Sequence, residues 1–228
     1  MTPGSTARGS AFPAAGPDER MLAALESRQI ANPIMLQGDP YLSGGRRVID
    51  PPAGHSIETA VCGVRFLDPA RVRYEIRTLR DETDAAARGF RVTHHGYCGT
   101  CSTLRDLAAY LRHRDMTYAV RSCSTRIGRG PMLSCLKKLG FSHECALTWY
   151  YNIRNTARQC LWTCLASWIR QEPLNRPDGS LNACLQCDED MSGPIFKYWA
   201  GRTRRNSGIR SEIGRRREEI RPVTHDYY

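Results

Sequence analysis

The 228-residue chain has no uncharged apolar stretch of about 18 residues, the length that a helix needs to cross a bilayer, so no membrane span is predicted. It also has no internal repeat, collagen period or low-complexity bulk. Its first residues lack the basic stretch and apolar run of a secretion signal. With 41% hydrophobic and 25% charged residues, the composition favours a globular domain over a disordered or fibrous protein.

The chain is rich in cysteine, and its ten cysteines all lie between Cys62 and Cys187. An even and high cysteine count is typical of a disulfide framework formed in an oxidising compartment. We therefore expect a secreted or extracytoplasmic protein, although the chain shows no signal peptide. Metal binding in a reducing compartment, or a mixture of metal sites and disulfides, is the alternative. The spacing alone does not specify which cysteines pair.

Composition shifts divide the chain into four predicted regions. Residues 1–17 are rich in Pro, Gly, Ala, Ser and Thr and are expected to form a disordered arm. Residues 18–57 read as a helix followed by a linker, and residues 58–200 as a cysteine-rich domain. Residues 201–228 form an arginine-rich tail that can pack on the domain. The predicted fold class is α+β, with a small β-sheet and a mainly helical, disulfide-rich C-terminal half.

The sheet is predicted from alternation of apolar and charged residues in the first part of the domain. Val72, Tyr74 and Ile76 alternate with charged residues, which is typical of a strand with one solvated face. A short helix over 81–88 and a strand over 90–94 follow it. This order of strand, helix and strand indicates a small α/β unit.

Helical spacing dominates after residue 103. The predicted helices start at Thr103, which fits a capping box with Asp106, at Pro131, at Ser142, at Thr156 (running to Arg170), and at Ser192. Residues 171–193, which hold Cys184 and Cys187, are predicted to form a loop.

The helical spacing also bears on cysteine pairing. Cys160 and Cys164 lie four residues apart on one predicted helix, so their thiols point the same way and each should pair elsewhere. Cys135 and Cys145 lie on neighbouring helices and are predicted partners.

The segment His95-Gly-Tyr-Cys98-Gly-Thr-Cys101 carries the most specific chemistry. Cys101 lies just before a predicted helix, where unpaired N–H groups and the helix dipole stabilise a thiolate. His94 and His95 can add positive charge or act as a base. Cys101, Cys98, His95 and His94 are therefore the predicted catalytic residues.

This heptapeptide resembles two known motifs. It is similar to the nucleophile segment of papain-like cysteine proteases, Gln-Gly-x-Cys-Gly-Ser-Cys-Trp, which would make Cys101 the nucleophile, Cys98 a disulfide cysteine and His95 the replacement of the oxyanion-hole glutamine. Ser102 departs from the aromatic residue of that motif. The strand, CxxC and helix also resemble the thioredoxin motif, in which Cys98 would attack and Cys101 resolve the mixed disulfide.

A zinc site is the third reading of the cysteines. Cys98-x-x-Cys101 and Cys184-x-x-Cys187 have the ligand spacing of two zinc knuckles. The long separation between these pairs and the six further cysteines favour disulfides, so no metal site is predicted as the leading interpretation.

Three longer stretches resemble an uncharacterised family of cysteine-rich, secreted proteins from microbial eukaryotes and bacteria. They are His95-Gly-Tyr-Cys-Gly-Thr-Cys-Ser-Thr-Leu-Arg-Asp-Leu, Pro177-Asp-Gly-Ser-Leu-Asn-Ala-Cys-Leu-Gln-Cys-Asp-Glu-Asp and Ala200-Gly-Arg-Thr-Arg-Arg-Asn-Ser-Gly. The resemblance covers residues 60 to 228. It implies export and disulfides, and it supplies no reaction.

Charge concentrates in the last part of the chain. Arg202, Arg204 and Arg205 are candidates for binding an anion such as a phosphate or a carboxylate. The acidic run Asp188-Glu189-Asp190 is expected to pair with the arginine-rich tail rather than to bind a cation. No nucleic-acid-binding module is visible, so nucleic acid is not a favoured partner.

The sequence favours a disulfide-stapled binding or structural domain. The alternatives are a thiol-dependent enzyme that uses Cys101, as a hydrolase, transferase or thiol-disulfide oxidoreductase, and a zinc-knuckle protein. No cofactor is predicted. The partner is unknown, with an anionic ligand as the candidate.

Overall fold

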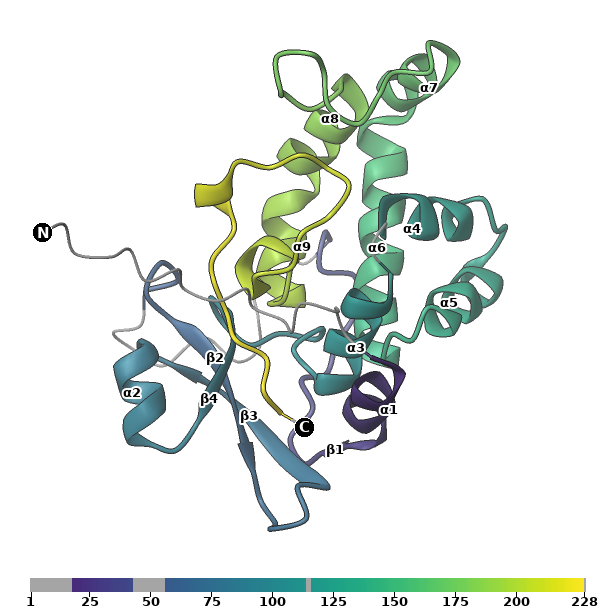
Figure 1. Ribbon diagram of the computed structural model, residues 1–228. Helices are drawn as coiled ribbons and strands as arrows, with labels where there is room; N and C mark the ends of the chain where they lie inside the picture. The colour runs from purple at the N-terminus through teal and green to yellow at the C-terminus, as the bar shows by residue number, and fades with distance from the viewer. Residues whose placement is uncertain (1–17, 43–55, 114–115, 228) are drawn as a thin grey trace, which may run out of the picture.

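The computed structural model describes residues 18–42, 56–113 and 116–227 (Figure 1). The predicted disordered arm lies outside these residues. The elements that they form are, in chain order, α1 (Glu19–Ser27), β1 (Gln29–Ile30), β2 (Val61–Phe66), β3 (Arg73–Leu79), α2 (Glu82–Ala87), β4 (Arg91–His95), α3 (Leu104–Arg112), α4 (Met116–Ser124), α5 (Arg129–Lys138), α6 (His143–Gln159), α7 (Leu161–Ile169), α8 (Ala183–Met191), α9 (Gly193–Ala200), and the 3-10 helices η1 (Arg205–Ser207) and η2 (Arg217–Glu219). The fold is α+β, as predicted.

The four strands form one mixed sheet in the order β1-β3-β2-β4, in which only the β1–β3 pair is parallel. On one face of the sheet, Val61, Leu79 and Phe90 pack with the short helix α2. On the other face, Tyr74 and Ile76 join the main core beneath the larger helices. Figure 1 shows this arrangement, with α2 on one side of the sheet and the helical part on the other.

The segment before the linker packs on the domain. Asp18 caps α1 by accepting a hydrogen bond from the Met21 N–H at 2.7 Å. The helix ends at Ser27, and Ile30 lies in β1 beside Tyr74 of β3. Asn32 then exchanges two hydrogen bonds with the Ile76 backbone, at 2.8 and 3.0 Å. The structure therefore joins residues 18–42 to the domain that we placed at 58–200.

The helical part follows the prediction at its caps and departs from it in three places. Thr103 and Ser142 cap α3 and α6 as predicted. The single helix expected over 156–170 is wrong, because the helix breaks at Cys160, where a disulfide holds the chain and α7 turns away. The loop expected over 171–193 contains α8, which Asn182 caps. Helix α4 was not predicted.

Ten cysteines form five disulfides and leave none free. The pairs are Cys62–Cys98, Cys101–Cys145, Cys123–Cys135, Cys160–Cys187 and Cys164–Cys184. Separate partners for Cys160 and Cys164 were predicted correctly. The predicted Cys135–Cys145 bond is wrong, because α4 brings Cys123 against Cys135 while Cys145 meets Cys101.

Residues 201–227, which we call the C-terminal segment, run back across the helices to the edge of the sheet (Figure 1). Val223, His225 and Tyr227 are buried. The Tyr227 hydroxyl donates a hydrogen bond to the Val92 carbonyl of the β4 region at 2.7 Å. The arginine-rich tail of the sequence is thus packed on the domain along much of its length.

Candidate functional site

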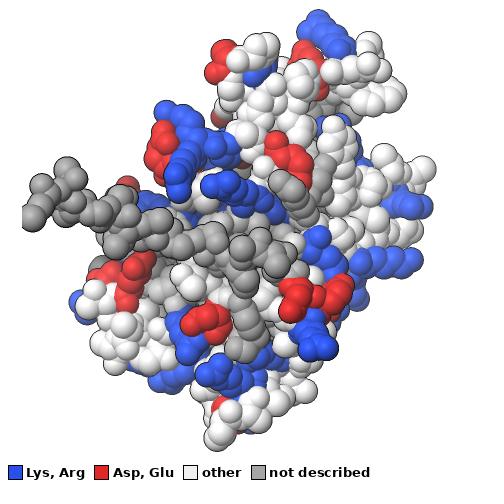
Figure 2. All heavy atoms as spheres, in the orientation of Figure 1, with Lys and Arg blue, Asp and Glu red and all other residues white. Residues whose placement is uncertain are grey.

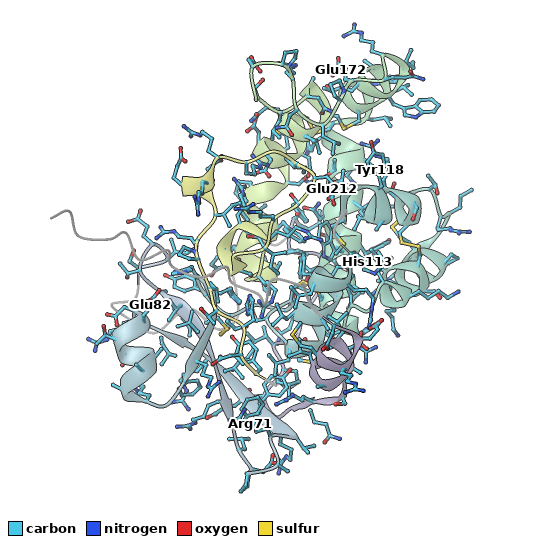
Figure 3. All side chains as sticks on the ribbon, viewed as in Figure 1. Arg71, Glu82, His113, Tyr118, Glu172 and Glu212 are labelled. Carbon is cyan, nitrogen blue, oxygen red and sulfur yellow. A yellow bond between two sulfur atoms is a disulfide. The ribbon has the colours of Figure 1, made fainter. Side chains whose placement is uncertain are left out.

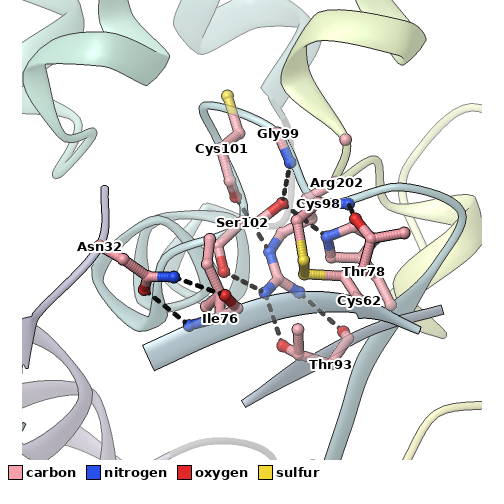
Figure 4. Close-up of a disulfide and its surroundings, with 12 residues drawn as sticks. Asn32, Cys62, Ile76, Thr78, Thr93, Cys98, Gly99, Cys101, Ser102 and Arg202 are labelled. Carbon is pink, nitrogen blue, oxygen red and sulfur yellow. Dashed lines mark hydrogen bonds between the residues drawn. A yellow bond between two sulfur atoms is a disulfide. The ribbon is translucent and has the colours of Figure 1, made fainter. Parts of the chain in front are cut away.

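The predicted catalytic segment forms a buried junction between the sheet and the helices. Cys98 is bonded to Cys62 of β2, and Cys101 to Cys145 of α6 (Figure 4). All four cysteines have at most 2% of their surface exposed. A thiolate nucleophile needs a free and accessible sulfur. The catalytic assignment of Cys101 and Cys98 therefore stays a prediction for a reduced form of the protein.

The predicted histidine His94 also takes a structural position, whereas Nε2 of the half-buried His95 lies 3.7 Å from a Glu82 carboxylate oxygen. His94 is fully buried, with Nε2 at 2.7 Å from Ser102 Oγ and Nδ1 at 2.9 Å from the His95 carbonyl. Burial, and then the charge of Arg202, hold the pKa of His94 well below its usual value, so the ring is neutral. A hydroxyl on a histidine nitrogen has the geometry of a nucleophile and its base. Because both side chains are buried, a substrate has no access to this pair.

Arg202 is the centre of the junction, where its fully buried guanidinium makes hydrogen bonds only to uncharged oxygens (Figure 4). It donates to the carbonyls of Thr93 at 2.9 Å and of Cys101 at 3.1 Å, and to Thr93 Oγ1 at 2.6 Å. Weaker bonds reach the Ser102 carbonyl and Ser207 Oγ, both at 3.3 Å. Each guanidinium nitrogen donates a hydrogen bond within the protein, so Arg202 holds β4, the motif and the C-terminal segment together.

Two glycines allow the motif to touch the end of α9 backbone to backbone. A Cβ atom on Gly99 would lie 2.3 Å from the Trp199 carbonyl oxygen, and one on Gly201 would lie 2.4 Å from the Gly99 nitrogen. The resulting contact includes hydrogen bonds from the Thr100 and Cys101 N–H groups to the carbonyls of Trp199 and Ala200, each at 2.9 Å. The glycines of the motif thus serve this close packing.

The zinc-knuckle alternative is wrong for this structure, because Cys98, Cys101, Cys184 and Cys187 all belong to disulfides. In the described part of the chain, no group of three or more His, Cys, Asp or Glu side chains could hold a metal ion. None of the helices described is long and apolar enough to cross a membrane.

The acidic run does pair with the tail, mainly through Glu189. Its carboxylate lies 2.9 Å from Lys197 Nζ and 2.8 Å from both Arg205 Nη2 and Arg215 Nη2. Although burial opposes the change, these three cations lower the pKa of Glu189. Arg205, one of the predicted anion-binding residues, is therefore already paired with a carboxylate. Figure 2 shows basic and acidic side chains gathered around the C-terminal segment.

Arg204 lines a cavity of about 800 Å³ that we call the helical cavity. Its walls come from α4, α6, α7, α8 and α9 and from residues 203–220 of the C-terminal segment. In Figure 3 this segment, labelled at Glu212, passes α6 toward α4, which is labelled at Tyr118. Cavities of this size are typical of sites for small molecules.

Apolar side chains from different elements supply most of the lining. They are Met116 and Val120 of α4, Trp149, Ile153 and Ala157 of α6, Leu161 and Trp168 of α7, Leu185 of α8, Phe196 of α9, and Ile209, Ile213 and Ile220 of the C-terminal segment. The lining therefore suits an aliphatic or aromatic group better than a fully polar one.

Charge in the helical cavity is strongly one-sided. Seven basic side chains line it against two carboxylates, those of Asp188 and Glu189. Glu189 is neutralised by its three cations, and burial raises the pKa of Asp188, which accepts a hydrogen bond from Thr156 Oγ1. The described residues supply no ion-pair partner for Arg210 or Arg217. The cavity thus combines apolar walls with an excess of positive charge.

Sequence reasoning found one part of this site and missed the rest. Arg204 and Arg205 were named from the arginine run, and both line the cavity. The wall formed by α4 was missed, although Met116 and Val120 have the spacing of one helix face. The wall formed by α8 was missed because Asp178-Gly-Ser, which is typical of a turn, and the nearby cysteine pair favour a loop in the sequence.

Comparison with known proteins gives one match. A family of unknown function, DUF8771, matches residues 129–223, which is less than half of the chain and includes α5 to α9 with most of the C-terminal segment. No curated protein and no solved structure matches. The matched part contains every wall of the helical cavity except α4 and the end of α3.

Proposed function

We propose that this protein is a secreted, disulfide-stapled binding domain whose helical cavity takes an amphipathic anion, a ligand with an apolar body and a negatively charged head. The observation that carries the proposal is the pairing of an apolar lining with seven basic side chains against two carboxylates in one cavity of about 800 Å³. An apolar ligand alone would not need the arginines, and a small inorganic anion would leave the apolar walls in water.

The apolar body of the ligand would lie against the helices. Met116 and Val120 face it from α4, Ile153 and Ala157 from α6, and Phe196 from α9. Burial of apolar area against these side chains contributes about 25 cal/mol per Å² removed from water. Because the walls belong to packed helices, the cavity is formed before the ligand arrives, which limits the ordering cost of binding.

The charged head would lie at the C-terminal segment. Arg210 is exposed and lines the cavity, and Arg204 holds the Arg210 carbonyl through Nη1 at 2.9 Å. Arg217 lines the same region. Guanidinium groups bind carboxylates and phosphates through paired hydrogen bonds, so a carboxylate, sulfate or phosphate head fits here.

Five disulfides support an oxidising, extracellular setting for this activity. Reducing cytosol would open such bonds, at a cost to stability of about 2–4 kcal/mol for each. Secretion is the finer proposal, and it is supported by the cysteine usage and by the resemblance to secreted cysteine-rich proteins.

Calorimetric titration with decanoate and with 1-decanol tests the proposal, because these probes share a chain and differ in the charged head. We expect decanoate to bind more tightly than 1-decanol. Arg210→Gln should weaken decanoate binding roughly tenfold, the effect of losing one charge-assisted contact, and leave 1-decanol binding unchanged. Arg126→Gln, an exposed arginine outside the cavity, is the matched control.

A cavity-filling variant completes the test. Ala157→Trp places a large side chain on an exposed position of the cavity wall and should abolish binding of both probes. Ser122→Trp, on α4 but outside the lining, should bind as the wild type does. If decanoate binds with equal affinity to the wild type and to Ala157→Trp, the helical cavity is not the site and the proposal fails.

A further inference from the structure

Helix α7 carries its apolar face outward. Leu161, Trp162, Leu165, Trp168 and Ile169 fall on one side of the helix, while Thr163, Cys164, Ala166 and Ser167 fall on the other. The first group is exposed, with 78% of Trp162, 68% of Trp168 and 67% of Ile169 open to solvent. Ser167, by contrast, is buried. Helices of globular proteins place these two faces the other way round.

Disulfides lock this inverted orientation. We call residues 160–191, with α7 and α8, the hairpin, and it projects from the top of the molecule in Figure 1. Cys160–Cys187 and Cys164–Cys184 tie the polar side of α7 to α8. Rotation of α7 about its axis would break these bonds, so the disulfides fix the exposed orientation of its apolar side chains. Figure 2 shows uncharged surface at the top of the molecule, beside basic and acidic side chains.

Positive charge borders this face. From Arg154 to Glu172 the chain has three exposed arginines, Arg154, Arg158 and Arg170, against one carboxylate. That carboxylate, Glu172, lies 3.7 Å from Arg170 Nη1 in a partly exposed ion pair, which leaves an excess of positive charge in this stretch. Arg158 lies just before the hairpin and Arg170 directly after α7. Tryptophan beside arginine suits the headgroup region of an anionic bilayer, where the indole ring meets the acyl boundary and the guanidinium meets phosphate.

A second copy of the chain fits this face less well. The five apolar side chains expose on the order of 600 Å², taking about 150–250 Å² for each large aromatic side chain, which is below the roughly 800 Å² per partner of stable interfaces. A twofold contact through α7 would also bring Arg158 and Arg170 of both copies near one another, with Glu172 as the one carboxylate between Arg154 and Glu172 to offset them.

We propose that the outward face of α7 docks this protein on the surface of an anionic lipid bilayer. The helix lies in the interface and inserts Trp162, Trp168 and Ile169, while Arg158 and Arg170 contact lipid phosphates. This inference goes beyond the proposed function and does not depend on it. The proposed docking face and the proposed ligand site are adjacent, because Leu161 and Trp168 also line the helical cavity.

Vesicle flotation and tryptophan emission test the docking. The full chain should float with phosphatidylcholine–phosphatidylglycerol vesicles, and its emission should shift to the blue. Trp162→Ser combined with Ile169→Ser should lower the partition coefficient about a hundredfold, because two apolar side chains no longer leave water. Ile127→Ser is the matched control, since Ile127 is 94% exposed and lies between α4 and α5.

The charge contribution is tested separately. Raising the ionic strength from about 0.1 M to about 1 M shortens the Debye length from about 10 Å to about 3 Å and should weaken the binding. Arg158→Gln with Arg170→Gln should reduce it on anionic vesicles. Ala157→Trp should still bind vesicles, which separates this proposal from that of the cavity ligand.

Three results would overturn the proposal. They are equal flotation of wild type and the Trp162→Ser, Ile169→Ser variant, equal binding to vesicles with and without phosphatidylglycerol, and a stable dimer in sedimentation that the same two substitutions dissociate. Both substituted positions are exposed, so an unchanged thermal midpoint of the variant shows that its fold is intact.

Discussion

The region around Arg202 and the hairpin each contain two disulfides but are built in opposite ways. In the first, which we call the loop core, Cys62–Cys98 and Cys101–Cys145 are buried among hydrogen bonds, apolar side chains and a buried guanidinium. In the hairpin, Cys160–Cys187 and Cys164–Cys184 join α8 to α7, a helix whose apolar side chains face solvent. The same bond type therefore supplements a packed core in one region and replaces it in the other.

The two regions therefore differ in the accessibility of their side chains. The polar groups of the loop core are hydrogen-bonded within the protein and buried, so a ligand cannot reach them. The loop core nevertheless holds the most enzyme-like motif of the sequence. The hairpin uses covalent bonds to keep an apolar surface exposed, which a purely hydrophobic fold of this size would bury. Disulfides can thus hold a surface open as well as a core closed.

The largest expected effect comes from removing the buried guanidinium. Arg202→Met should lower the free energy of unfolding by about 3–5 kcal/mol, because the carbonyls of Thr93, Cys101 and Ser102 lose their buried donors. Arg170→Met, which removes an exposed arginine at the end of α7, should change it by less than about 0.5 kcal/mol. Denaturant unfolding followed by circular dichroism measures both, and equal losses would contradict the comparison.

Mild acid should weaken the region around Arg202 through a buried histidine, a residue type that the hairpin does not contain. Burial, and then the charge of Arg202, lower the pKa of His225 from 6.5 to about 4. Above pH 6.5 the ring is neutral in both the folded and unfolded states. As the pH falls below 6.5, only the unfolded state takes up the proton, so stability is lost until the pH reaches about 4.

This loss is about 3 kcal/mol for His225, at roughly 1.4 kcal/mol per pKa unit. The His225→Gln variant lacks this titrating group, so its free energy of unfolding should not fall by this amount. Between pH 7 and pH 4, the gap in unfolding free energy between variant and wild type should therefore shift in favour of the variant by the same amount. Urea unfolding at several pH values measures the gap. A gap that stays constant with pH would show that folding does not lower the pKa of His225.

The smallest effect on global stability is expected from the hairpin. Cys164→Ala with Cys184→Ala removes a bond that closes a stretch of 20 residues, worth about 3 kcal/mol. We expect that loss to appear as local opening, with faster proteolysis between α7 and α8 and a small change in the main unfolding transition. Cys101→Ala with Cys145→Ala, in the loop core, should instead lower the main transition. Proteolysis with mass spectrometry and thermal unfolding separate these outcomes.

Local signals predicted the parts of the fold that local chemistry decides. The alternation of Val72, Tyr74 and Ile76 gave the strand β3, and the side chains of Thr103 and Ser142 gave the starts of α3 and α6. These features depend on residues within a few positions of one another. The same is true of the shared direction predicted for the thiols of Cys160 and Cys164, which follows from helix geometry alone and requires separate partners.

The partners of the cysteines and the position of the site could not be predicted in this way. Cys145 meets Cys101 rather than Cys135, because α4 brings Cys123 against Cys135 and the start of α6 lies against the motif, which is a property of the whole core. Arg202 and Arg204 are two positions apart in one arginine run, yet the first is buried among carbonyls and the second lines a cavity. Their sequence context is the same, and the packing of the C-terminal segment makes them different.

The backbone contact between the motif and the end of α9 sets an order for synthesis and folding. Thr100 and Trp199, which meet there, are 99 positions apart in the chain. The loop that holds Cys98 and Cys101 therefore stays open while the ribosome completes the helices, and it closes only after Arg202 has emerged. During that interval the sulfurs can be oxidised and their pairs exchanged. Once the C-terminal segment packs on the domain, it shields the completed disulfides of Cys98 and Cys101.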